Sequence, residues 1–125
     1  MSGEERAFEL IEKNRGAMID LQRDLVAVPA VAPESGGDGE AEKAEVLVDR
    51  LKRLGIVEVE VLSAPDERVS SGSRPNVVAT VPGESAESSF WVMTHLDVVP
   101  PGDEALWNSP PFQTVSYTHL TLPTN

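Results

Sequence analysis

The sequence predicts an α/β fold in which helices are layered on a sheet. Apolar residues recur at helical spacing up to about residue 54, and three short strand patterns follow. A length of 125 residues suits one domain, and 40% hydrophobic residues are enough for a modest core. We therefore expect the order helix, helix, strand, strand, strand, with no internal repeat.

A long amphipathic helix is expected from Gly3 to about Ala27. Within it, residues spaced three and four positions apart form one stripe along the helix, and a single residue of this stripe is polar. The stripe consists of Ile11, Asn14, Met18, Leu21 and Leu25. Pro29 and Pro33 end the helix, because proline lacks the N–H donor and pushes the preceding residue toward extended backbone.

A second helix is expected after the glycine-rich loop Ser35–Gly39, with Asp38 as its N-cap and Gly55 as its stop. Its apolar stripe consists of Ala44, Leu47, Leu51 and Leu54. Glycines before a helix are also typical of phosphate-binding loops. This loop has no lysine, and its acidic neighbours would repel a phosphate, so we favour a flexible loop with a helix cap.

Three strand candidates follow, and their patterns differ. Over Val57–Val61 valines alternate with glutamates, which is typical of a strand with one solvated face. The segments Asn76–Val81 and Phe90–Thr94 are nearly continuous apolar runs, as expected of strands buried on both faces. The polar stretches Pro65–Arg74 and Pro82–Ser89 are the expected connections.

The charge balance argues against two classes of partner. Ten basic against 21 acidic residues give a formal net charge of −11, and such a surface repels phosphate, so no nucleic acid is expected. No apolar run approaches the roughly 18 to 20 residues that span a bilayer, so no membrane is expected. The acidic amino terminus does not resemble a secretory signal, and the absence of cysteine excludes disulfides and thiolate metal sites. We expect a cytoplasmic protein.

The segment Met93–Asp103 carries the strongest candidate site, where an apolar strand is expected to run into a loop. Side chains of extended backbone repeat every second residue, so His95 and Asp97 should project to the same side of the strand end. A neutral imidazole binds a divalent metal through one nitrogen while a neighbouring carboxylate accepts the other ring N–H. On spacing alone, a hydrogen-bonded structural pair is the commoner interpretation.

A longer string extends this pair. It resembles the first active-site signature of the dinuclear zinc amidohydrolase and peptidase family, which includes succinyl-diaminopimelate desuccinylase, acetylornithine deacetylase and carboxypeptidase G. The string reads His95-Leu96-Asp97-Val98-Val99-Pro100, then Gly102-Asp103, Trp107 and Pro110-Pro111-Phe112. The resemblance covers about residues 5 to 112. It implies that residues 1–112 are the amino-terminal part of a helix-layered, zinc-peptidase-like catalytic domain, which is incomplete here.

By this resemblance His95 matches the family's first zinc-binding histidine, and Asp97 matches the active-site aspartate that orients it. The resemblance also implies one or two zinc ions, with cobalt as a substitute, a small N-acyl amino acid or peptide substrate, and a homodimeric parent protein. The family's other ligands and its glutamate base have no match in this chain, so the fragment is expected to be inactive. The alternative is a non-catalytic acidic α/β binding module with His95 and Asp97 as a hydrogen-bonded pair.

Composition changes after Phe112. The segment Gln113–Asn125 contains no Asp, Glu, Lys or Arg, and we interpret it as a non-native or disordered tail in which His119 is accidental. Trp107 and Phe112 have two interpretations, a substrate platform or packing against the loop. Packing is the favoured one.

Overall fold

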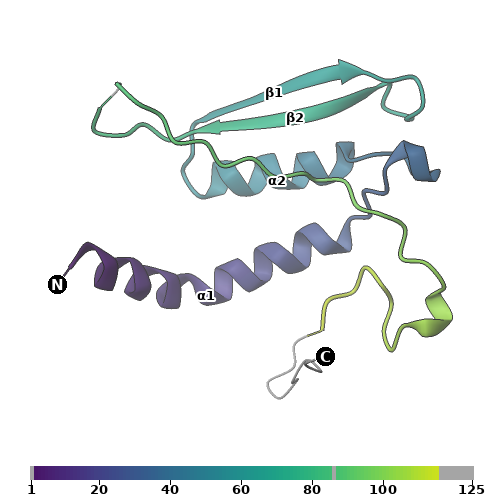
Figure 1. The fold of residues 1–125 in the computed structure, drawn as a ribbon, viewed down its shortest axis with the longest axis horizontal. Helices are drawn as coiled ribbons and strands as arrows, with labels where there is room; N and C mark the ends of the chain where they lie inside the picture. Colours follow the sequence, from purple (N-terminus) through teal and green to yellow (C-terminus); the bar gives the residue numbers. More distant parts are fainter. Residues whose placement is uncertain (1, 86, 116–125) are drawn as a thin grey trace.

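A computed structural model describes residues 2–85 and 87–115 of the chain. Its elements are helices α1 (Gly3–Ala27) and α2 (Ala41–Arg53), strands β1 (Glu58–Pro65) and β2 (Ser73–Thr80), and short 3-10 helices at Pro33–Ser35 and Glu104–Leu106. The strands pair antiparallel, α2 packs against them, and α1 lies on the far side of α2 (Figure 1). The α/β class is thus confirmed as a two-stranded sheet with two helices. Within the described residues, neither helix has the length and apolar character needed to cross a bilayer.

Helix α1 has the predicted bounds. A capping box begins it: the Glu5 N–H donates to the Ser2 hydroxyl (3.1 Å), and the Ser2 N–H donates to the Glu5 carboxylate (2.7 Å). The helix meets α2 near its own carboxyl end, where Asp24 forms an ion pair with Arg50. None of its residues is buried. The amphipathic stripe is therefore present, but much of its apolar surface is exposed.

Helix α2 begins later than predicted. Its N-cap is Glu40, which makes no capping side-chain bond, so the prediction of Asp38 as the N-cap is wrong. Gly39 has a φ of 78°, which turns the chain between Asp38 and the helix. The Asp38 carboxylate accepts instead from the N–H (2.6 Å) and the hydroxyl of Ser70. At the other end Gly55, with a φ of 85°, follows the last turn as predicted.

The glycine-rich loop before α2 is packed against its neighbours. A Cβ added to Gly37 would lie 2.0 Å from the Val31 carbonyl oxygen, so the backbone would have to move. We expect Gly37→Ala to lower the free energy of unfolding by about 1–3 kcal/mol, the usual cost of overpacking. The matched control is Gly16→Ala in α1, where a Cβ meets open space and should stabilise by roughly 0.5–1 kcal/mol. Urea unfolding measures both, and equal effects of one sign would contradict the prediction.

The sheet is a hairpin in which Val61 lies opposite Val77. Strand β1 overlaps the first predicted strand, and β2 overlaps most of the second. The prediction that the second strand is buried on both faces is wrong, because its residues are half-buried or exposed. A hairpin with one helix layer against it has one face covered and the other in water.

The third predicted strand, Phe90–Thr94, is also wrong. The segment is irregular and pairs with no strand among the described residues, and Phe90 and Met93 are 92% and 94% exposed. A strand buried on both faces needs partners along its edges and layers above and below it. Residues 2–85 and 87–115 supply only a hairpin and two helices. The described residues therefore leave this apolar run exposed.

The described chain beyond the bridge at Val98 is irregular, apart from the short 3-10 helix Glu104–Leu106. Asp103 accepts a hydrogen bond from the Ala105 N–H (2.9 Å), and the Trp107 ring N–H donates to the Pro101 carbonyl (2.9 Å). This contact ties the Trp107 ring to its own loop, while 48% of the residue is exposed, so the choice between packing and a substrate platform stays a prediction. Of the predicted tail, residues 116–125, with His119, lie outside the described residues.

Candidate metal centre

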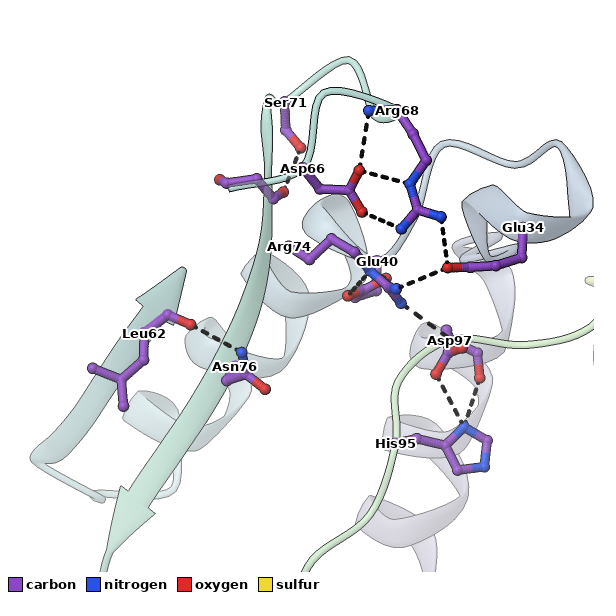
Figure 2. Close-up of polar contacts among 11 residues, drawn as sticks. Glu34, Glu40, Leu62, Asp66, Arg68, Ser71, Arg74, Asn76, His95 and Asp97 are labelled. Atoms are coloured by element: carbon purple, nitrogen blue, oxygen red, sulfur yellow. Dashed lines mark hydrogen bonds and ion pairs between the residues drawn. The ribbon is translucent and has the colours of Figure 1, made fainter. Parts of the chain in front are cut away.

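His95 and Asp97 lie side by side (Figure 2). The His95 Nδ1 is 2.7 Å from the Asp97 backbone carbonyl oxygen and 3.4 Å from the Asp97 carboxylate. Because a carbonyl oxygen only accepts, Nδ1 carries the proton, and the lone pair of a neutral imidazole is then on Nε2. The His95 side chain is 82% exposed, so Nε2 is open to a ligand. The predicted meeting of the two side chains is confirmed.

One backbone bridge fixes the main chain next to the pair. The Val98 N–H donates to the Ala30 carbonyl (2.9 Å), and the Ala32 N–H donates to the Val98 carbonyl (3.2 Å). This isolated parallel bridge joins the segment to the linker after α1, where Ala30 is fully buried. The predicted location of the pair at the carboxyl end of a central strand is wrong, because the preceding apolar run forms no strand.

A guanidinium from β2 faces Asp97. Arg74 donates through Nε and Nη2 to the two carboxylate oxygens of Glu40 at 2.9 and 3.0 Å, and its Nη2 lies 3.9 Å from Asp97 Oδ2. The side chains of Glu40 and Arg74 are 8% and 26% exposed. The hydrogen bonds to Glu40 hold the pKa of the Arg74 guanidinium above its ordinary value. Arg74 therefore joins the start of α2, the sheet and the His95 segment (Figure 2).

A second guanidinium extends this network into the loop between the strands. Arg68 donates to Asp66 through Nε (2.8 Å) and Nη2 (2.7 Å), and its Nη1 lies 2.9 Å from Glu34. Glu34 in turn lies 3.8 Å from Arg74. The hydrogen bonds from Arg68 lower the pKa of Asp66 to about 2. The loop after β1 is thus tied to the 3-10 helix that contains Glu34.

The lowered pKa of Asp66 makes this tie dependent on pH. Its stabilisation is fully present above pH 3.8, the ordinary pKa of the group, and is lost as the pH falls toward about 2. We expect Asp66→Asn to lower the thermal unfolding midpoint near pH 6, with the difference from wild type shrinking toward pH 2. The control is Glu67→Gln, which removes an exposed neighbouring charge. A constant difference at all pH values would contradict the prediction.

Lys43 is a buried charge near the site. It lies in the first turn of α2 and is 7% exposed. Burial lowers the pKa of its ammonium, and the Asp97 carboxylate opposes that shift. Asp97 thus has two cationic neighbours from the body of the fold, Lys43 and Arg74. Neither was singled out in the sequence.

The described residues fit one ligand position of a zinc site. A catalytic zinc usually has three protein ligands and an open position. In residues 2–85 and 87–115 no three His, Cys, Asp or Glu side chains come together to hold a metal. What is present is one imidazole with an open Nε2 and the acceptor that fixes its proton, which is the arrangement of a metal-binding histidine with its orienting partner.

Similarity to known proteins agrees with this chemistry. An uncharacterized metallohydrolase of Methanococcus maripaludis is 32% identical over 99 residues, which are 76% of this chain and 24% of the relative. One of Methanocaldococcus jannaschii is 31% identical over 112 residues, 86% of this chain and 26% of the relative. Succinyl-diaminopimelate desuccinylase of Colwellia psychrerythraea is 31% identical over 102 residues, 82% of this chain and 23% of the relative.

No protein-family profile matches the chain, and no solved structure is similar to it. The chain spans roughly a quarter of the length of the curated relatives above. All three are named as metallohydrolases or as the desuccinylase, as the signature around His95 implies. The chain is therefore a homologue of the metallohydrolases that include succinyl-diaminopimelate desuccinylase.

Proposed function

We propose that residues 1–112 are the amino-terminal part of the catalytic domain of a zinc-dependent hydrolase, and that residues 113–125 are a non-native tail. The enzyme would cleave an amide or peptide bond in a small N-acyl amino acid or a dipeptide. One observation carries the proposal: in a homologue of metallohydrolases, His95 presents an open Nε2 while its Nδ1 donates to the Asp97 backbone carbonyl and lies 3.4 Å from the Asp97 carboxylate. One or two zinc ions, with cobalt as a substitute, and a homodimeric parent belong to the same proposal.

His95 and Asp97 have distinct roles in this proposal. His95 would bind zinc through Nε2. Asp97 would select the tautomer that leaves Nε2 unprotonated, hold the ring in place and raise its basicity. When bound, zinc supplies Lewis-acid chemistry, which acidifies water and polarises a carbonyl. The remaining ligands and the general base would come from outside the described residues.

A non-catalytic acidic binding module is the second candidate. It is favoured by the lack of a third metal donor near His95 in the described part of the chain. In that case the contact of 2.7 Å between His95 and Asp97 would only stabilise the loop. The two candidates differ in what the gene encodes beyond the codon for Phe112. An enzyme needs further carboxylate and histidine ligands there, and a binding module does not.

The decisive experiment compares the 125-residue chain with the full-length protein read from that gene. We expect the chain to bind zinc weakly in calorimetric titration and to hydrolyse neither N-succinyl nor N-acetyl amino acids, because one imidazole is too few ligands. The full-length protein should hydrolyse one of these classes, and a chelator should abolish the activity. Tight stoichiometric zinc binding with turnover by the 125-residue chain would contradict the expectation, and an inactive full-length protein would favour the binding module.

A further inference from the structure

The position of the Asp97 carboxylate needs an explanation beyond its own segment. The preceding residues Phe90–Thr94 are exposed and unpaired among the described residues, and the bridge at Val98 fixes only the backbone. Backbone bonds do not determine how an aspartate side chain rotates. A side-chain contact must therefore hold the carboxylate beside His95 Nδ1. Two cationic side chains face it, Lys43 and Arg74, and Arg74 forms the ion pair with it, at 3.9 Å.

Arg74 is itself held firmly. Glu40 binds it through three N–H contacts of 2.9 to 3.2 Å, and Glu40 is almost completely buried. A forked contact of this kind fixes the plane of the guanidinium as well as its position. The sheet residue Arg74 thus presents its Nη2 from a fixed site to Asp97 Oδ2, while Asp97 Oδ1 lies 3.4 Å from His95 Nδ1. Figure 2 shows this continuous chain of contacts.

We infer that Arg74 is a positioning residue for the candidate metal centre: anchored by Glu40, it holds the Asp97 carboxylate 3.4 Å from His95 Nδ1. There the carboxylate reinforces the hydrogen bond to the Asp97 backbone carbonyl (2.7 Å), which keeps the proton on Nδ1 and leaves Nε2 free for a metal. The consequence for metal binding rests on the proposed function, whereas the effect on the imidazole proton does not. Arg74 touches neither His95 nor a metal position, so it acts only through Asp97. Loss of Arg74 should therefore change the tautomer of His95 directly, and activity only as a consequence.

The first test reads the His95 tautomer by ¹⁵N NMR in the full 125-residue chain without metal, above pH 8, where imidazole is neutral. The chain has two histidines, and His119→Asn assigns the signals. We expect Arg74→Gln to lower the ratio of the Nδ1–H to the Nε2–H form by about twofold to fivefold, because the backbone hydrogen bond remains and the carboxylate contact at 3.4 Å contributes at most as much as one ordinary hydrogen bond. Arg74→Lys should give an intermediate ratio, because lysine keeps the charge but loses the fork.

The matched control is Arg68→Gln. Arg68 shares Glu34 with Arg74 but does not contact Asp97 in the described network, so its loss weakens the same network without touching the carboxylate. Its tautomer ratio should equal that of wild type. If Arg74→Gln and Arg68→Gln give equal ratios, the inference is overturned. If Arg74→Gln fails to fold, the folded Arg74→Lys variant decides, and an unchanged ratio there overturns the inference.

The second test uses the full-length protein. We expect Arg74→Gln to lower kcat by about 10-fold, the lower end of the range for partners of a metal ligand, with KM unchanged. Combined with Asp97→Ala it should cause no loss beyond that of Asp97→Ala alone, because residues acting through one another are not additive. Additive losses would overturn the inference. Absence of metal-dependent hydrolysis in the wild type would instead overturn the proposed function, while the NMR result would still decide the role of Arg74.

Discussion

Replacing His95 with alanine in the full-length protein is expected to lower metal-dependent kcat/KM by more than about 100-fold, which exceeds the usual effect of losing a residue that only orients a metal ligand. The reason is that the open Nε2 of His95 is the proposed metal-binding atom, with the proton of the ring held on Nδ1 by the Asp97 backbone carbonyl at 2.7 Å. Zinc content after gel filtration and steady-state kinetics measure the change. Full zinc occupancy and normal turnover in the variant would contradict the role.

The control for this prediction is Asp97→Ala. It leaves the imidazole in place and removes only the carboxylate near Nδ1, so activity or zinc affinity should fall by about 10-fold to 100-fold. In the 125-residue chain the same change should have little effect on weak zinc binding. Equal losses for the two variants would mean that Asp97 is itself a ligand. No loss for Asp97→Ala would mean that the backbone carbonyl alone fixes the tautomer.

Replacing Glu40 with alanine should have the largest effect on stability. Removal of one partner of a buried ion pair leaves the other charge without compensation and costs about 3–5 kcal/mol when both are fully buried. Glu40 is almost completely buried, but Arg74 keeps 26% of its side chain exposed, so we expect a loss of about 2–3 kcal/mol. Urea unfolding followed by circular dichroism measures it.

Two further variants test whether the loss of stability comes from the ion pair between Glu40 and Arg74. Glu40→Gln keeps the shape of the side chain and one acceptor oxygen, so it should be less destabilising than Glu40→Ala. Glu45→Ala removes an exposed carboxylate from the same helix and should change stability by less than about 0.5 kcal/mol. If Glu40→Ala is as mild as Glu45→Ala, the pair with Arg74 does not stabilise the fold.

The features that could be predicted from the sequence are those that neighbouring residues determine. The bounds of α1 follow from the stripe and the two prolines, the end of α2 follows from Gly55, and the meeting of His95 with Asp97 follows from their separation of two residues. Each of these depends on backbone geometry over a few positions. Local patterns therefore predicted that His95 and Asp97 meet, but not where the pair lies in the fold, and the metal-binding role of His95 stays a prediction.

The features that were missed depend on residues far apart in the sequence. Asp38 fits an N-cap locally, yet it binds Ser70, 32 positions away. Arg74 and Glu40 are 34 positions apart, so no spacing rule relates them. The local signals were an acidic residue next to the start of a helix and an arginine near the start of a strand, and neither has a distinctive pattern.

The isolated bridge between Val31 and Val98 has a consequence for the order of folding. Its two partners lie at opposite ends of the segment that contains α2 and the hairpin, so forming it first would mean closing a long loop with few contacts in return. Once α2 and the hairpin have packed and Glu40 has bound Arg74, the same two ends are already close together. The His95 segment should therefore be the last described part of the chain to become ordered, and its amides the first to exchange with solvent.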